Sequence, residues 1–255
     1  MVKFVTPIGR RALVIAGAAV LVVAAAGTAA AVGVPSSSPS HTASLAAGGR
    51  SSATLEVVTG TPLLYVRVAS LGGTNGTLLR ASTPAGAPSQ VTLSWGDGRN
   101  PAGQRDVAVL SASSGTTPVT VTLNRAVSWR LDFAGGTEQT VADLRAGNVA
   151  AVTFTAGSDT IDLSLPAPRG MVPVRLAGGA SQFRLSVPGG VPLRVTAAGG
   201  AGEVSVDGAS YCGVGGGSVF ATRGWSAATA GFDVDATAGA ALVSVARWSR
   251  ERASS

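Results

Sequence analysis

The sequence predicts an all-β protein, a single β-solenoid of about 21 residues per coil, preceded by one N-terminal hydrophobic helix. Three observations predict it. Short runs that alternate apolar and polar residues follow Ala53, glycines recur at a nearly constant step, and a long charge-free apolar run lies near the N-terminus. The composition provides for a large core, because 45% of the 255 residues are hydrophobic and only 13% are charged.

The N-terminal region is typical of membrane targeting. Residues 1–11 hold three basic side chains and are expected to be a short cytoplasmic segment. Residues 12–34 carry no charge, and a helix of this length spans the ~30 Å hydrocarbon core of a bilayer. Basic residues ahead of such a helix stay in the cytoplasm, which places the remaining chain outside the cell membrane. The alternative is a secretory signal cleaved near Ala29–Ala31, after which the domain is secreted.

Three further segments follow the apolar run. Residues 35–52 are rich in Pro and Ser, lack apolar periodicity, and are expected to be a flexible linker. Residues 53–248 form the predicted extracytoplasmic domain, and residues 249–255 form a polar tail. Strands are expected where side chains alternate, as in Val119–Leu123, Ile161–Leu165 and Phe183–Val187.

Glycine spacing predicts the coil length. The last glycine of each turn recurs at steps of 21, 21, 22 and 21 residues, at Gly115, Gly136, Gly157, Gly179 and Gly200. Each turn stands between two strands, so strands of successive coils would stack in parallel, with Thr140, Ile161, Phe183 and Val204 above one another. Glycine at this corner indicates positive φ or close backbone approach. The turns of residues 53–114 are irregularly spaced, so the place of this segment in the stack is open. For the domain as a whole, a β-sandwich is the alternative fold.

The residue types exclude several kinds of chemistry. One Cys and one His cannot provide a disulfide within the chain, a thiolate metal site or a His-based triad. No nucleotide-binding motif is present, so we expect no catalytic residue, no metal and no cofactor. After the N-terminal basic residues, the remaining 16 basic residues are scattered arginines, and we therefore expect no nucleic-acid partner. Cys212 is expected to be a small buried residue.

Trp129–Asp207 resembles a known family. Its runs LDFAGGTEQTVADL and VTFTAGSDTIDLSLPAPRGMVPVRLAGGASQFRLSVPGG place Gly-Gly or Gly-Ala corners between strands that end in Leu-Pro or Val-Pro. This pattern is similar to the toast-rack, or putative-adhesin, β-solenoid domains of bacterial envelope proteins. The resemblance implies an envelope domain that senses, scaffolds or binds, and it offers no functional residues to carry over.

We therefore expect a non-catalytic, membrane-tethered extracytoplasmic module that acts in binding, scaffolding or adhesion. Arginine recurs about once per coil, and one polar face of the stack is predicted to contact an envelope polymer or a membrane-protein partner through Arg130, Arg175, Arg184 and Arg194. One alternative is an envelope polysaccharide-active enzyme, which needs carboxylates clustered across coils. The coil length instead places Asp132 level with Thr153 and Arg175, a mixed polar ladder. The other alternative is an accessory component of envelope-stress signalling.

Overall fold

The computed structural model describes residues 40–98, 105–113, 115–227 and 229–249. The expected cytoplasmic segment and the hydrophobic helix lie outside these residues. The described residues form strands and turns with one short 3-10 helix, η1 (Gly73–Asn75), so the all-β prediction is confirmed. In this part of the chain, no helix has the length and apolar character that a membrane crossing requires.

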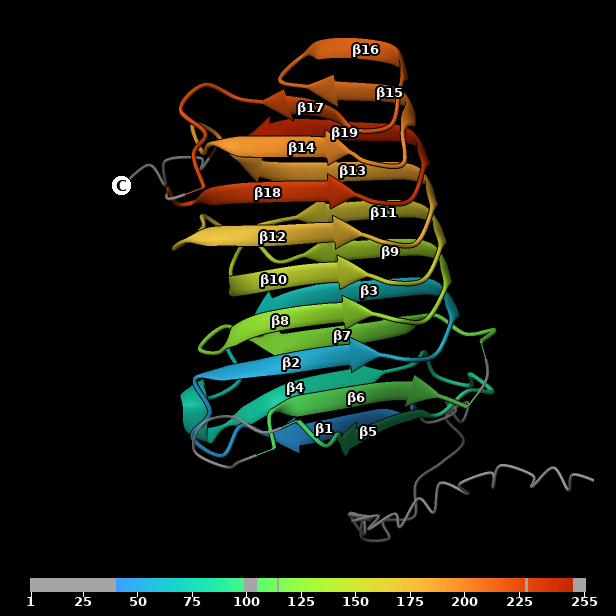
Figure 1. Ribbon diagram of the computed structural model, residues 1–255. Coiled ribbons are helices and arrows are strands. Elements are labelled where there is room, and N and C mark those ends of the chain that lie inside the picture. The colour runs from blue at the N-terminus through green and yellow to red at the C-terminus, as the bar shows by residue number, and fades with distance from the viewer. Residues whose placement is uncertain (1–39, 99–104, 114, 228, 250–255) are drawn as a thin grey trace, which may run out of the picture. The chain divides into compact units, whose positions relative to one another are not determined.

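The strands form two sheets that enclose one hydrophobic core (Figure 1). The first sheet has ten strands, in the spatial order β1 (Thr42–Ala46), β4 (Thr77–Ser82), β7 (Val119–Asn124), β3 (Thr61–Ala69), β9 (Thr137–Asp143), β11 (Ser158–Ser164), β13 (Ala180–Pro188), β19 (Ala240–Trp248), β15 (Ala201–Val206) and β16 (Ala209–Val214). The second sheet has nine strands, in the order β17 (Ser218–Ala221), β14 (Leu193–Ala197), β18 (Gly231–Ala236), β12 (Met171–Leu176), β10 (Asn148–Phe154), β8 (Ser128–Phe133), β2 (Ser52–Val57), β6 (Val107–Ala112) and β5 (Val91–Trp95).

Each sheet is parallel at its centre and antiparallel at its ends. Neighbours are parallel from β7 to β15 in the ten-stranded sheet and from β14 to β6 in the nine-stranded sheet. The pairs that involve β1, β4, β16, β17 and β5 are antiparallel. The chain passes from one sheet to the other and back, as from β10 to β11 and then to β12. The parallel centres distinguish this arrangement from a sandwich of antiparallel sheets.

The predicted register is confirmed from β9 to β13, and it is wrong between β13 and β15. Thr140, Ile161 and Phe183 are neighbours on β9, β11 and β13, as the 21-residue spacing predicts. Val243 of β19 then lies between Phe183 and Val204, because β19 pairs with both β13 and β15. The predicted contact between Phe183 and Val204 is therefore wrong. The C-terminal strands β18 and β19 insert between two coils that follow one another in the sequence.

The N-terminal strands insert in the same way. β2 pairs with β6 and β8, and β3 pairs with β7 and β9. The segment 53–114, whose place was open, therefore contributes β2, β3 and β6 to the parallel stack. Its remaining strands, β4 and β5, lie with β1 at the antiparallel end. The spacing is irregular because these two strands and their loops stand between β3 and β6 in the sequence.

A column of glycines marks the corner at which the chain enters the ten-stranded sheet. In the order of the stack these residues are Gly115, Gly60, Gly136, Gly157, Gly179, Gly239 and Gly200. The two inserted coils supply Gly60 and Gly239, so the column continues although the sequence order is broken. Close approach requires glycine at Gly60, where a Cβ atom would lie 2.8 Å from the carbonyl oxygen of Gly136. At Gly157 and Gly179 the nearest carbonyl oxygen would lie 3.4 and 3.5 Å from an added Cβ atom. Within the column only Gly200 has a positive φ.

Large apolar side chains from both sheets fill the core. The rings of Phe133 and Phe154 stack with centroids 4.7 Å apart, and Phe183 contacts Phe154 edge-on at 6.2 Å. Trp129 is fully buried, and its indole Nε1 donates a hydrogen bond of 2.9 Å to the carbonyl oxygen of Asn124. Each buried side chain of this kind contributes roughly 1.5–3 kcal/mol. Because the neighbouring coils cover these side chains, stability depends on stacking.

The domain begins before residue 53, so the predicted boundary is wrong. β1 lies within residues 35–52, which were expected to be a flexible linker, and it pairs with β4. Ala43 and Leu45 pack against the core, and Ala47 is buried. This alternation spans five residues of mostly small side chains, and such a weak pattern does not distinguish a strand from a linker.

Candidate functional site

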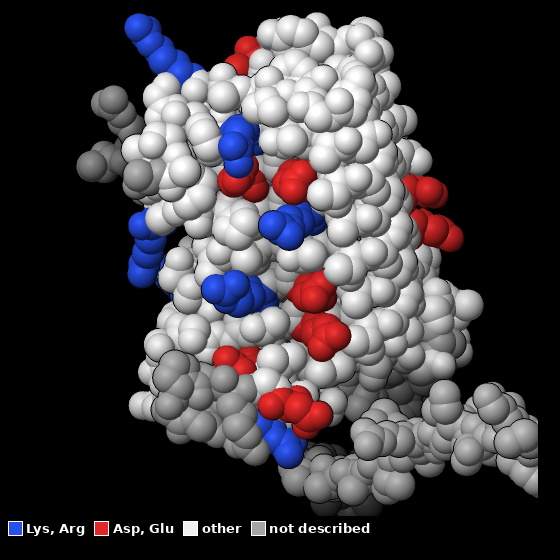
Figure 2. Space-filling model, in the orientation of Figure 1, with Lys and Arg blue, Asp and Glu red and all other residues white. Residues whose placement is uncertain are grey.

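Charged side chains lie along the outer face of the nine-stranded sheet (Figure 2). We define this charged face by Glu56, Arg130, Asp132, Arg175, Arg194, Asp233 and Asp235, which belong to β2, β8, β12, β14 and β18. Alternation along each strand sends the adjacent residues, such as Leu131 and Val174, into the core. The charged side chains therefore point away from the core on the outer surface of this sheet.

The cross-strand register arranges the charged face in two rows. One row consists of Glu56, Asp132, Thr153, Arg175, Asp235 and Thr196. The predicted alignment of Asp132, Thr153 and Arg175 is thus confirmed. The other row, two residues earlier on each strand, holds Arg130 and, further along the stack, Asp233 beside Arg194. Both rows carry charges of both signs, although Glu56 and Asp132 are direct neighbours of the same sign.

Arg194 is held within the protein. Its guanidinium donates hydrogen bonds of 2.9 and 2.7 Å to the two carboxylate oxygens of Asp233. Its Cζ lies 4.2 Å from the centroid of the Trp225 ring. Hydrogen bonding to Asp233 raises the pKa of Arg194 above its ordinary value. This arginine therefore contacts Trp225 on the sheet, and its charge is already paired with Asp233.

Arg130 and Arg175 are exposed and have no side-chain hydrogen bond or ion pair among the described residues. β10 separates their strands, so the backbones that carry the two arginines lie about two strand spacings, ~10 Å, apart along the stack. Of the four arginines that the sequence singled out, these two are the ones available to a partner.

Arg184 lies on the other side of the molecule, so the prediction of one face with four arginines is wrong. It belongs to β13 of the ten-stranded sheet, where its guanidinium pairs with Asp162 at 3.4 Å. It also donates to the side chain of Gln182. The physical reason is that each coil crosses both sheets. Arg175 and Arg184 belong to one coil, in the successive strands β12 and β13, and therefore face opposite directions.

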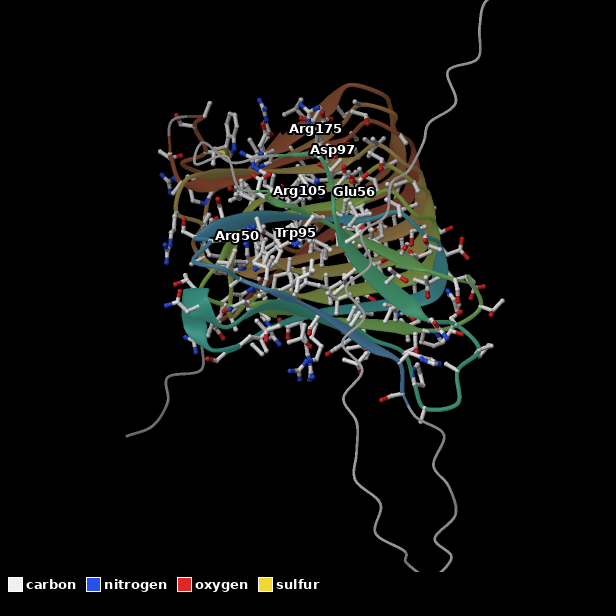
Figure 3. All side chains as sticks on the ribbon, turned by 90° about the horizontal axis from the view of Figure 1, so that it is seen from below. Arg50, Glu56, Trp95, Asp97, Arg105 and Arg175 are labelled. Atoms are coloured by element: carbon white, nitrogen blue, oxygen red, sulfur yellow. The ribbon has the colours of Figure 1, made fainter. Side chains whose placement is uncertain are left out.

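A second arginine–tryptophan contact lies toward the β5 end of the nine-stranded sheet (Figure 3). The Cζ atom of Arg50 lies 4.2 Å from the centroid of the Trp95 ring. Arg50 also donates hydrogen bonds to the carbonyl oxygens of Arg105, at 2.8 Å, and Ala47, at 2.9 Å. Sequence reasoning missed this contact, because the irregular segment gave no register for Trp95. It ties the chain before β2 to the end of the sheet.

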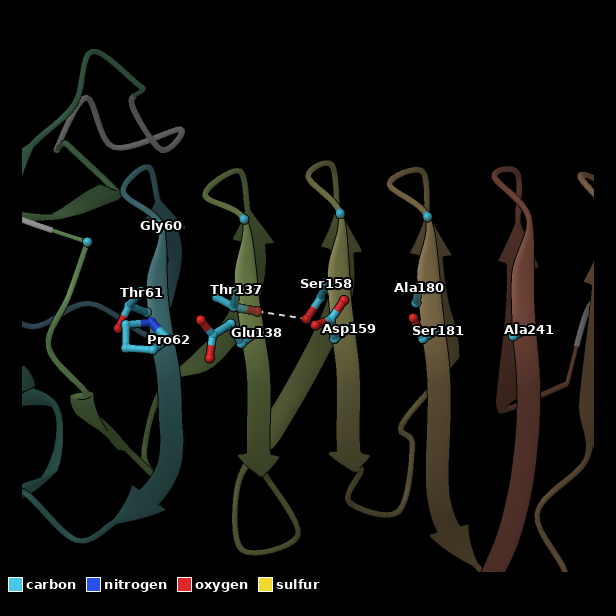
Figure 4. Close-up of a pocket in the computed structure, with 14 residues that line it drawn as sticks. Gly60, Thr61, Pro62, Thr137, Glu138, Ser158, Asp159, Ala180, Ser181 and Ala241 are labelled. Carbon is cyan, nitrogen blue, oxygen red and sulfur yellow. Dashed lines mark hydrogen bonds between the residues drawn. The ribbon is translucent and has the colours of Figure 1, made fainter.

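A groove of about 750 Å³ follows the glycine column (Figure 4). It exists because the corner residues lack side chains. Thr137 and Ser158 lie beside it, and their hydroxyl oxygens are hydrogen-bonded at 2.8 Å. Glu138 and Asp159 follow them on β9 and β11, level with each other and exposed. Their separation of 21 residues equals the coil length, so this carboxylate pair could have been found from the sequence.

Cys212 is exposed, and the prediction that it is buried is wrong. It lies on β16, the last strand of the ten-stranded sheet, where nearly every residue is exposed. The sequence does not reveal which strand ends a sheet. In the described part of the chain, no three His, Cys, Asp or Glu residues are grouped so that they could hold a metal ion.

No family model matches the chain, and no curated protein sequence matches it. The chain is similar in structure to a putative cell adhesion protein from Clostridium sporogenes, known from a crystal structure. The TM-score is 0.54 with 15% sequence identity, and the match covers 82% of this chain and 99% of that one. At this level of identity the likeness is one of fold.

Proposed function

We propose that the domain is a toast-rack-like β-solenoid that acts as a non-catalytic, adhesin-like binding module, tethered outside the cell membrane by residues 12–34. The observation that carries the binding role is the pair Arg130 and Arg175, which are exposed and unpaired among the described residues on the charged face. The likeness in fold to a putative cell adhesion protein supports an adhesin-like role. The charge-free run of residues 12–34 supports the tether.

The charge pattern favours one kind of partner. Glu56 and Asp132 lie in the same row as Arg175, and Arg130 lies in the neighbouring row on the same strand as Asp132. A uniformly anionic polymer would be attracted by the arginines and repelled by the carboxylates. A protein surface can place charges of both signs opposite these groups. We therefore infer that the partner is a membrane protein of the envelope rather than an anionic envelope polymer.

The experiment compares variants of the full chain reconstituted in lipid vesicles. Labelled fragments of the native cell envelope are added, and their retention is measured before and after protease treatment of the fragments. Replacing Arg130 and Arg175 by Ala should weaken retention by roughly two- to thirtyfold, since each exposed ion pair contributes about 0.2–1 kcal/mol. Protease treatment should abolish the difference between the variant and the unmodified chain.

The control variant is Arg184→Ala, which removes an exposed arginine from the opposite sheet. It should retain the fragments as the unmodified chain does. Equal retention by all variants would dismiss the charged face as the contact surface. Retention that survives protease treatment and still depends on Arg130 would point to the polymer instead. Alkaline extraction of native membranes tests the tether separately, because an uncleaved anchor stays in the bilayer.

The alternative function, a polysaccharide-active enzyme, would need a pair of carboxylates, and the groove has one pair at its rim. Glu138 and Asp159 are level with each other on adjacent strands whose backbones are about 4.8 Å apart, and retaining glycosidases use two carboxylates. If this pair is catalytic, the full chain should cleave cell-wall polysaccharide, and Glu138→Gln with Asp159→Asn should abolish cleavage. We expect no cleavage by either protein, because both carboxylates are solvent-exposed on a rim that does not enclose a substrate.

A further inference from the structure

The two ends of the stack are built differently. At one end β5 contacts both β1 and β4, so the edges of the two sheets close on each other (Figure 1). At the other end stand β16 and β17, which we call the end face. β16 is exposed along nearly its whole length, and Tyr211 and Val219 are 48% and 56% exposed. The rings of Tyr211 and Phe220 have centroids 4.8 Å apart, so they connect the two strands at this end of the stack.

The end face lacks most of the usual protection of a sheet edge, although its strands are short, with six residues in β16 and four in β17. Among the described residues β16 pairs only with β15, and β17 pairs only with β14, so each strand has one free edge. Natural sheets guard such edges with charged side chains, Pro or bulges, because unpaired backbone groups attract another strand. Residues 209–221 contain no charged residue and no Pro. An exposed, uncharged edge with large apolar side chains indicates a contact surface.

We propose that the end face binds a second copy of this chain across a two-fold axis perpendicular to both sheets. In such a dimer β16 pairs antiparallel with the partner's β16, and β17 pairs with the partner's β17. Both sheets then continue from one copy into the other. Identical antiparallel strands are self-complementary under two-fold symmetry. The strands at this end already pair antiparallel within the chain.

Two observations favour a second copy over another occupant. The free edges of both sheets lie at the same end, and a two-fold copy satisfies both, whereas one extended peptide satisfies only one. The surface is also uncharged, so two copies meet without the repulsion that identical charged surfaces would cause. At the opposite end β5 lies against β1 and β4, so the edge strands there pack against each other. This inference does not depend on the charged face.

The test measures the association of the full chain in detergent by sedimentation over a wide range of concentrations. We expect a reversible dimer. Val219→Lys places a charge beside its own copy and should raise the dimer dissociation constant about tenfold or more, because like charges across an interface are costly. Since Val219 is exposed, this variant should keep the circular dichroism spectrum and melting temperature of the parent. Ser210→Lys, an exposed site on β16, should act in the same way.

The matched control is Val58→Lys, an exposed valine that follows β2 inside the stack. It should leave the dimer unchanged. Cys212, the only cysteine, gives a second readout, because mild oxidation should link the dimer through Cys212 of both copies, and less so in Val219→Lys. A monomer at all concentrations, or the same dissociation constant for Val219→Lys as for the control Val58→Lys, overturns the proposal. So do head-to-tail oligomers without a Cys212 disulfide. The envelope-retention experiment would be unaffected by these results.

Discussion

At the scale of single residues, contact distance explains the glycine corner better than backbone conformation does. The two glycines of one turn differ sharply. A Cβ atom on Gly178 would overlap the carbonyl group of Ala156 in the neighbouring coil. A Cβ atom on Gly179 would lie 3.5 Å from the carbonyl oxygen of Gly239, an ordinary contact. Neither glycine has a positive φ.

Gly178→Ala should therefore destabilise the protein by about 1–3 kcal/mol or more, because two backbones must move apart in a packed stack. Gly179→Ala, one residue away, should change the free energy of unfolding by less than about 0.5 kcal/mol. Chemical denaturation of the full chain measures both. Equal effects of the two substitutions would show that close approach is not what selects glycine here.

At the scale of strands, the sequence predicts strand pairs well and their neighbours less well. The alternation that defines β11 and β13 lies within the chain itself, and the 21-residue step places Ile161 beside Phe183. The insertion of β18 and β19 produces no such regular spacing in the sequence. Those strands have the same alternation and a glycine of their own, Gly239, so their sequence pattern is compatible with several positions in the stack. Which gap they fill depends on shape and length across the whole core.

In the candidate site too, contacts between consecutive coils could be predicted, and contacts with the inserted strands could not. Asp132, Thr153 and Arg175 were predicted to align because consecutive coils carry them, and the alignment is confirmed. The pairing of Arg194 with Asp233 could not be predicted, since it joins β14 to the inserted β18. The exposure of Cys212 could not be predicted either. It follows from the position of β16 at the end of the stack, and this position depends on the order of the coils.

At the scale of the whole molecule, the order of coils determines the function we propose. The inserted β18 brings Asp233 to Arg194 and leaves Arg175 level with Asp235, so it sets which arginines are free. It also leaves β16 and β17, rather than the C-terminal strands, at the open end. Both the charged face and the end face thus depend on the terminal strand pairs lying inside the stack.

Engineered cysteine pairs test this order most directly. In a Cys212→Ser background, Arg184→Cys is combined either with Ser244→Cys, its neighbour on β19, or with Ser205→Cys, its neighbour if coils stacked in sequence order. Disulfides need Cα atoms within roughly 7 Å, which adjacent strands satisfy and strands about 10 Å apart do not. The inserted order predicts that only the pair with Ser244→Cys forms a disulfide within the monomer. A disulfide with Ser205→Cys, and none with Ser244→Cys, would contradict it.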